Sequence, residues 1–223
     1  LQPDRLAFYS YAHVPWIKGN GQRGFKDEDI PKDDKKRMLY ETGKKLLFEN
    51  GYHEIGMDHF ALKTDSLYDA FENGNLHRNF MGYSSSKTQL MIGLGVSSIS
   101  DSWYSFAQNV KNLEDYYQML EWNKLPIFRG HLLTNEDLII RKHILNLMCQ
   151  FETSWADNST YFEEIPAVLN QLEEMQNDGL VVFKENGIQV TEAGKPFVRN
   201  ICMAFDLLLK RKAPETALFS MTV

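Results

Sequence analysis

Nearly continuous apolar runs alternate with amphipathic stretches through the first half of the chain. The runs cover residues 5–14, 52–57 and 91–96, and the stretches between them cover 31–50 and 65–73. A run without alternation is typical of a parallel strand covered on both faces, whereas apolar residues at helical spacing indicate an amphipathic helix. Strand, helix and strand in this order predict a βαβ unit with parallel strands. The first half therefore predicts part of a (β/α) barrel.

Helices predominate in the pattern of the second half. They are predicted at 112–122, 134–151 and 162–178, followed by strands at 180–183 and 188–191 and a long helix from 191 to about 212. Thr134 and Asp137 have the spacing of a capping box. Asn186-Gly187 predicts a hairpin turn whose two central residues have positive φ. We therefore predict an α/β chain, with a barrel portion at 1–111 and a mainly helical, winged-helix-like domain at 112–223.

Size and charge limit the classes of protein that fit. The chain has 223 residues, of which 43% are hydrophobic, and this is enough for a sizeable core. Its net charge of −6 and the acidic helix at 162–178, which carries five carboxylates and no Lys or Arg, argue against nucleic-acid binding. No apolar run approaches the roughly 20 residues of a membrane span.

The cysteines indicate the compartment. Cys149 and Cys202 have no second cysteine nearby, which excludes a disulfide framework and a zinc ribbon and predicts free thiols in the cytoplasm. The spacing of His59 and His77 matches no metal-ligand pattern, so no metal site is predicted. The chain starts at Leu1 and enters an apolar run at once. This start fits a processed or trimmed terminus, or a piece of a longer protein.

Polar groups that could carry chemistry follow the predicted strands. Asp58 and His59 could bind a substrate amine and transfer protons, or form a buried pair that satisfies loop amides. Arg78 could bind a carboxylate through its guanidinium group, or make a structural ion pair. Gly93 and Gly95 are interpreted as positions where a bulky ligand approaches the strand backbone.

Five ordered blocks of sequence carry a resemblance to a known family. They lie at 11–16, 56–61, 77–83, 93–100 and 200–206. Together they resemble the C-terminal half of bacterial oxygen-independent coproporphyrinogen III oxidase, also called coproporphyrinogen dehydrogenase, a family of radical S-adenosylmethionine (SAM) enzymes.

The resemblance implies a partial (β/α) barrel with a helical C-terminal domain, and a radical reaction. In the family, a [4Fe-4S] cluster cleaves SAM to a 5′-deoxyadenosyl radical, which takes a hydrogen from a propionate of coproporphyrinogen III. Loss of CO2 and an electron leaves a vinyl group, and two rounds give protoporphyrinogen IX for haem biosynthesis. An electron donor is implied as a partner.

The cluster motif, Cys-x-x-x-Cys-x-x-Cys, is absent from this sequence. The resemblance places the cluster ligands and most SAM contacts in an N-terminal half. We therefore expect the chain to be a fragment that neither binds the cluster nor turns over alone, and that has the N-terminal half as its partner.

The family also implies roles for single residues. Ala12 and Ile99 fall on SAM-contacting positions, and Phe80 and Met81 fall on the loop that shapes a second SAM site. Met81 stands where glutamine is familiar, and Ser84-Ser85 stand where threonines are common, so the chain departs from the family's pattern at the second SAM site.

For the substrate, the interpretation is that Arg78 pairs with a propionate and Asp58 faces the pyrrole nitrogens, with His59 and Tyr83 beside them. No catalytic residue is assigned in this chain.

Two alternatives remain at this point. The haem-chaperone branch of the same superfamily binds haem without oxidising coproporphyrinogen, but it lacks the blocks at 57–60 and 78–80. A non-catalytic winged-helix interaction module would use the second half of the chain alone.

Overall fold

The computed structural model describes residues 1–11, 13, 24 and 26–212. The first sheet has three strands, β1 (Arg5–Ala7), β2 (Tyr52–Gly56) and β3 (His59–Leu62), in the order β1-β3-β2. β3 pairs antiparallel with both neighbours. β1 and β2 therefore run in the same direction, as the βαβ prediction requires, but they do not pair with each other.

The sequence did not predict β3, the strand that separates β1 from β2 and follows a short turn after β2. Met57 has a φ of 50° and, with Asp58, turns the chain so that His59 starts a strand that folds back on β2. β1 is also shorter than the predicted strand at 5–14, of which residues 12 and 14 lie outside the described residues.

The helices of the first half agree with the sequence pattern. α1 (Asp33–Glu49) fills the stretch predicted at 31–50, and α2 (Ser66–Glu72) fills the one at 65–73. The Asp65 carboxylate accepts a hydrogen bond from the Leu67 backbone N–H at 2.7 Å and so caps α2. It also forms an ion pair with Arg5, which links β1 to this helix.

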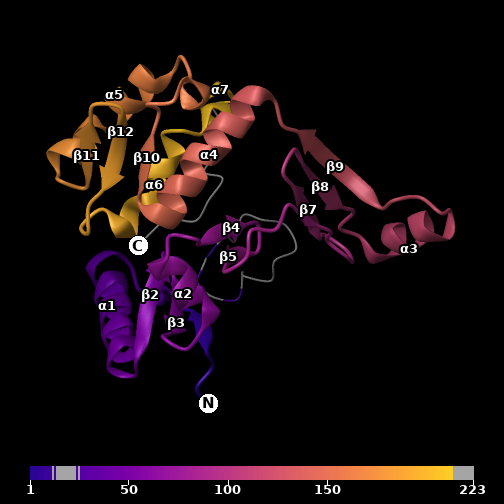
Figure 1. Cartoon of the computed structure of the whole chain (residues 1–223). Coiled ribbons are helices and arrows are strands. Elements are labelled where there is room, and N and C mark those ends of the chain that lie inside the picture. Colours follow the sequence, from indigo (N-terminus) through magenta and orange to yellow (C-terminus); the bar gives the residue numbers. More distant parts are fainter. Residues whose placement is uncertain (12, 14–23, 25, 213–223) are drawn as a thin grey trace.

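The next segment forms a hairpin and a meander where a third parallel strand was predicted. β4 (His77–Asn79) pairs antiparallel with β5 (Gly82–Ser84). β6 (Leu90–Met91), β7 (Ile99–Ser102), β8 (Ser105–Asn109) and β9 (Ile127–Leu132) form an antiparallel four-stranded sheet in chain order. Figure 1 shows this sheet projecting away from the rest of the protein, with α3 (Leu113–Glu121), which connects β8 to β9, at its far end.

The predicted strand at 91–96 is wrong because the chain turns there. Gly95 has a φ of 93° and Ser97 a φ of 62°, values that interrupt extended backbone. Asn109 holds this turn, since its side-chain amide donates hydrogen bonds to the carbonyls of Gly93 and Gly95 at 3.1 and 2.8 Å.

The rest of the chain packs helices against a second three-stranded sheet. Its elements are α4 (Asn135–Gln150), β10 (Glu152–Ser154), α5 (Ile165–Asn177), β11 (Val181–Lys184), β12 (Gly187–Val190), α6 (Val198–Met203) and α7 (Leu207–Lys212). Short 3-10 turns occupy Asp27–Asp29, Asn158–Thr160 and Lys195–Phe197. The sheet order is β10-β12-β11. The capping box of Thr134 and Asp137 is confirmed at the start of α4.

Two details of this half differ from the predictions. The hairpin closes with Lys184 opposite Gly187, and neither Asn186 nor Gly187 has positive φ. Glycine is required at 187 for another reason, because a Cβ there would lie 2.5 Å from the Thr153 carbonyl of β10. The predicted long helix from 191 is broken into α6 and α7, and the Asp206 carboxylate starts α7 by accepting from the Leu209 N–H.

The hydrophobic core is continuous across the predicted domain boundary. It joins Ile55 and Leu67 of the first half to Leu147, Ile188 and Phe205 of the second. The four-stranded sheet also crosses the boundary, because β9 pairs with β8. The division at 111/112 stays a prediction. Within the described part of the chain, no helix is long and apolar enough to cross a membrane.

Candidate functional site

A cleft of about 850 Å³ lies between the four-stranded sheet and helices α4, α6 and α7, and the β4–β5 turn reaches into its wall. α4 forms the long wall and also contacts β4, β10 and α6 (Figure 1). The apolar lining residues are Phe80, Ile99, Phe106, Leu133, Ile140, Ile144, Leu145, Met148, Met203 and Leu208. The volume is in the range of sites for large organic ligands, and the lining suits a ligand with an apolar body.

Arg78 on β4 lines this cleft. Its Nη1 atom is buried and has no hydrogen-bond partner in the described residues, while its Cζ lies 4.7 Å from the centre of the Tyr83 ring. A buried donor without an acceptor costs ~1–3 kcal/mol, more for a charged group. Such a donor indicates a site whose acceptor is brought by a ligand.

The other residues predicted to contact substrate gather beside Arg78. His59 Nδ1 lies 2.8 Å from a carboxylate oxygen of Asp58, and the His59 ring meets Tyr83 edge-on at 5.1 Å between centroids. Gly82, with a φ of 131°, makes this contact possible, because a Cβ there would lie 2.9 Å from His59 Nε2. Residues from β3, β4, β5 and the turn before β3 thus form one cluster, although their role toward substrate stays a prediction.

The electrostatics of the cluster favour a charged Asp58 and a neutral Tyr83. Partial burial raises the pKa of Asp58, but the hydrogen bond and charge of His59, with Arg78 beyond, bring that pKa below its ordinary value. Burial raises the pKa of Tyr83 far above its ordinary value. The Tyr83 hydroxyl donates to the Met148 carbonyl at 2.8 Å, so it anchors β5 to α4.

The positions predicted to contact SAM are partly assembled. Phe80 and Ile99 both line the cleft. Met81 is 77% exposed on the β4–β5 turn, which Asn79 shapes by accepting a hydrogen bond from the Met81 N–H. Ala12 lies outside the described residues. The aromatic and aliphatic surface of Phe80 and Ile99 suits the flat apolar face of an adenine-containing cofactor.

The glycines at 93 and 95 have a role in the backbone, and their interpretation as points of ligand approach stays a prediction. A Cβ at Gly93 would lie 2.7 Å from the Ile99 carbonyl oxygen, so the glycine allows two backbone segments to meet. The Gly93 N–H also donates to the Ser100 hydroxyl at 3.1 Å. Their effect on the site is indirect, since they fix β7 and therefore Ile99.

Both thiols are buried and protonated. Burial raises the pKa of Cys149 and that of Cys202 to about 12. Cys202 forms part of the cleft wall. In the described part of the chain, no group of three or more His, Cys, Asp or Glu side chains could hold a metal ion.

Sequence reasoning missed three arginines of the cleft, Arg129, Arg141 and Arg199. Arg141 is the best fixed, because it donates to the Ser102 carbonyl and to Asp101, each at 2.8 Å. The sequence signal for it was weak, since a single arginine on an amphipathic helix is ordinary. Only the packing of α4 against β7 shows that it faces the cleft.

Comparison with known proteins identifies the relatives of this chain, although no family model matches it. It is similar to proteins named oxygen-independent coproporphyrinogen III oxidase from Escherichia coli strain K12 (41% identity), Pseudomonas aeruginosa (38%) and a Synechocystis species (36%). These alignments cover 94–96% of this chain and 46–48% of the relatives. The chain thus spans about half the length of the curated relatives that it matches.

A solved structure supports the same relationship. A chain described as the coproporphyrinogen III oxidase HemN from Escherichia coli, a radical SAM enzyme, matches with a TM-score of 0.84 and 39% identity. The match covers 93% of this chain and 49% of that chain. The family resemblance inferred from the sequence is confirmed, and the mixed α/β fold is that of about half of a radical SAM enzyme.

Proposed function

We propose that this chain forms a substrate-binding part of an oxygen-independent coproporphyrinogen III oxidase, a radical SAM enzyme of haem biosynthesis. The reaction is the oxidative decarboxylation of two propionates of coproporphyrinogen III to vinyl groups, which gives protoporphyrinogen IX. The similarity to enzymes of that name over nearly the whole chain supports this proposal.

The observation that carries the proposal is the unpartnered Nη1 of Arg78 in the wall of an apolar cleft. A tetrapyrrole with propionates has an apolar body and charged carboxylates at its edge. The cleft lining can cover the body, and a guanidinium fork can hold one carboxylate by two charge-assisted hydrogen bonds. The Asp58 carboxylate, held in its charged form by His59, suits the N–H groups of the pyrroles.

The cofactors divide between this chain and the remainder of the protein. Phe80 and Ile99 provide a surface for SAM, whose cleavage by a reduced [4Fe-4S] cluster supplies the hydrogen-abstracting radical. The cluster does not fit the described residues, because the two cysteines are buried, protonated and on different helices. Its ligands are therefore assigned to the N-terminal half, which with an electron donor is a proposed partner. The proposed compartment is the cytoplasm.

The test uses the intact protein in an anaerobic assay of protoporphyrinogen formation. R78Q is expected to raise the KM for coproporphyrinogen III at least tenfold, because it removes the fork and its charge. R37Q, which alters an arginine of α1 that pairs with Glu41, is the control and should keep the wild-type KM. Unchanged kinetics of R78Q would remove Arg78 from the site.

A second test concerns this chain alone. When the 223-residue chain is reconstituted with iron and sulfide, we expect none of the charge-transfer absorbance that a [4Fe-4S] cluster produces. Cluster formation at full occupancy would show that the ligands lie in this chain.

The winged-helix-like arrangement of α4, β10, α5, β11 and β12 favours one further candidate, a non-catalytic interaction module. Nucleic acid is an unsuitable partner, since α5 and the turn before it carry Glu163, Glu164, Glu173 and Glu174. Retention of the chain on DNA that weakens with salt would overturn this charge argument and support a nucleic-acid-binding module, and no retention at low salt would remove it.

A further inference from the structure

The arginines of the described chain divide into two groups by their partners. Four of them pair with carboxylates: Arg5 with Asp65, Arg37 with Glu41, Arg141 with Asp101, and Arg211 with Glu136 and Glu164. The remaining three, Arg78, Arg129 and Arg199, have no carboxylate partner within the described residues, and all three line the cleft.

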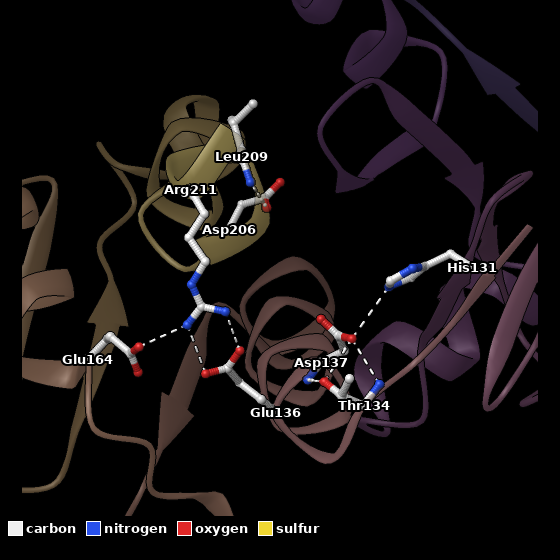
Figure 2. A network of polar contacts seen from close by, with 8 residues as sticks. All are labelled: His131, Thr134, Glu136, Asp137, Glu164, Asp206, Leu209 and Arg211. Carbon is white, nitrogen blue, oxygen red and sulfur yellow. Dashed lines mark hydrogen bonds and ion pairs between the residues drawn. The ribbon is translucent and has the colours of Figure 1, made fainter. Parts of the chain in front are cut away.

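The carboxylates of the cleft form no ion pair with these three arginines in the described residues, and each has another partner in the fold. Asp101 is paired with Arg141 at 2.8 Å. Asp137 accepts from the backbone and hydroxyl of Thr134, each at 2.8 Å, with His131 Nε2 at 3.4 Å (Figure 2). Asp206 accepts from the Leu209 N–H, as Figure 2 also shows. Three guanidinium groups in the cleft are thus left for a ligand.

The three arginines come from different walls. Arg78 lies on β4, Arg129 on β9 of the four-stranded sheet, and Arg199 on α6 on the helical side. Arg129 is fixed by one hydrogen bond, from its Nε to the Gln108 side-chain oxygen at 2.9 Å, which leaves its other four N–H donors. A ligand that reaches all three must carry several anionic groups spread around one body.

We propose that Arg129 and Arg199, with Arg78, each bind a different carboxylate of the same ligand, so that the cleft selects its ligand by the number of carboxylates at its edge. This inference rests on the proposed function, where the substrate has four propionates and the product has two. It adds that the cleft prefers the tetracarboxylate to the dicarboxylate. The product, which has lost two carboxylates in the reaction, then binds more weakly than the substrate and is released more readily.

The test measures binding to the intact protein of two stable porphyrins that share a macrocycle. Coproporphyrin III has four propionates, and mesoporphyrin IX has two propionates with ethyl groups in place of the others. Titration followed by porphyrin fluorescence is expected to show tighter binding of coproporphyrin III. R129Q and R199Q should each weaken that binding about tenfold, equivalent to ~1.4 kcal/mol. Each should weaken mesoporphyrin binding less than it weakens coproporphyrin binding, because two propionates can pair with the two arginines that each variant keeps.

Two further variants make the result specific. R129K and R199K keep the charge without the planar fork, so we expect a smaller loss. R37Q is the matched control and should bind both porphyrins as the wild type does. The difference between the two porphyrins should also shrink as salt increases.

The inference is overturned if R129Q and R199Q bind coproporphyrin III like the wild type, or if they lose both porphyrins equally. A turnover assay separates this from failure of the proposed function. If the wild type turns over coproporphyrinogen III and the variants bind coproporphyrin III like the wild type, only the arginine assignment is refuted. Selective binding without turnover by the wild type refutes the proposed function and leaves the polycarboxylate site standing.

Discussion

α1 and α4 are helices of almost equal length with opposite surroundings. α4 has 16 residues and buries Ile140, His143, Leu147, Met148 and Cys149. α1 has 17 residues and buries none, and it leaves Met38, Leu39, Leu46 and Phe48 about half exposed. The contrast follows from position, since α4 lies between the second sheet, β4 and α6, whereas α1 packs on one face of the first sheet, mainly against β2.

The apolar side chains of α4 are covered by the rest of this chain, whereas those of α1 are not. Around α4, the side chains of Leu147, Ile188 and Phe205 are fully buried. Around α1, apolar side chains remain in solvent, as they do on a surface that another part of a larger protein covers.

The largest expected effect distinguishes the two helices directly. L147A should lower the free energy of unfolding by ~2–5 kcal/mol, because it opens a cavity in the core. L46A, the matched control on α1, removes the same atoms from a side chain that is 53% exposed, and should lower it by less than ~1 kcal/mol. Urea unfolding of both variants gives the values, and equal losses would contradict the contrast.

The next effect is the pH dependence that His143 gives to the core. His143 is fully buried, its Nε2–H donates to the Thr160 carbonyl and its Nδ1 accepts from the Thr153 hydroxyl, each at 2.7 Å. Burial lowers the pKa of His143 in the folded protein, so as the pH falls the unfolded chain binds a proton on this side chain before the folded protein does. Stability should therefore fall as the pH drops below about 6.5, by at most ~1.4 kcal/mol per pH unit. Denaturant unfolding between pH 7 and 5 measures this, and H143Q should show a flatter dependence.

A smaller effect compares two helix caps. T134A removes the cap of α4 and should lower global stability by ~1 kcal/mol. N112A removes the cap of α3, which buries no residue, and should increase hydrogen exchange in α3 with little global change. If N112A destabilises the whole chain as much as T134A, the projecting sheet and α3 are part of the same cooperative unit.

The smallest effect concerns the ion pairs that hold α7. Arg211 donates to Glu136 and Glu164 in solvent, as Figure 2 shows, and its side chain is 53% exposed. R211Q should leave global unfolding unchanged at physiological salt and increase hydrogen exchange in α7. A clear drop in the midpoint of urea unfolding would show that α7 stabilises the whole core.

The sequence predicted elements set by local patterns better than those set by strand pairing. Helices with an N-cap and an amphipathic stripe, such as α2, α3 and α4, lie where they were expected. The strand β3 was missed because one positive φ at Met57 reverses the chain after β2, and nothing in the apolar pattern signals that turn.

The site was predicted in part for the same physical reason. Asp58, His59, Arg78 and Tyr83 were proposed because their family blocks are contiguous, and the fold brings them together. Of the four, Arg78 lines the cleft, and their role toward substrate stays a prediction. Arg129 and Arg199 lie far apart in sequence in segments without a motif. Only the packing of α6 and β9 around one cleft shows that they belong with Arg78.

Hydrogen exchange of the intact protein with and without coproporphyrin III tests the central claim that this cleft is the substrate site. The account predicts that the porphyrin slows exchange in the β4–β5 turn, β7 to β9 and α6, and leaves the hairpin of β11 and β12 unchanged. Protection confined to segments outside the cleft, or none in this chain while the porphyrin is bound, would contradict it.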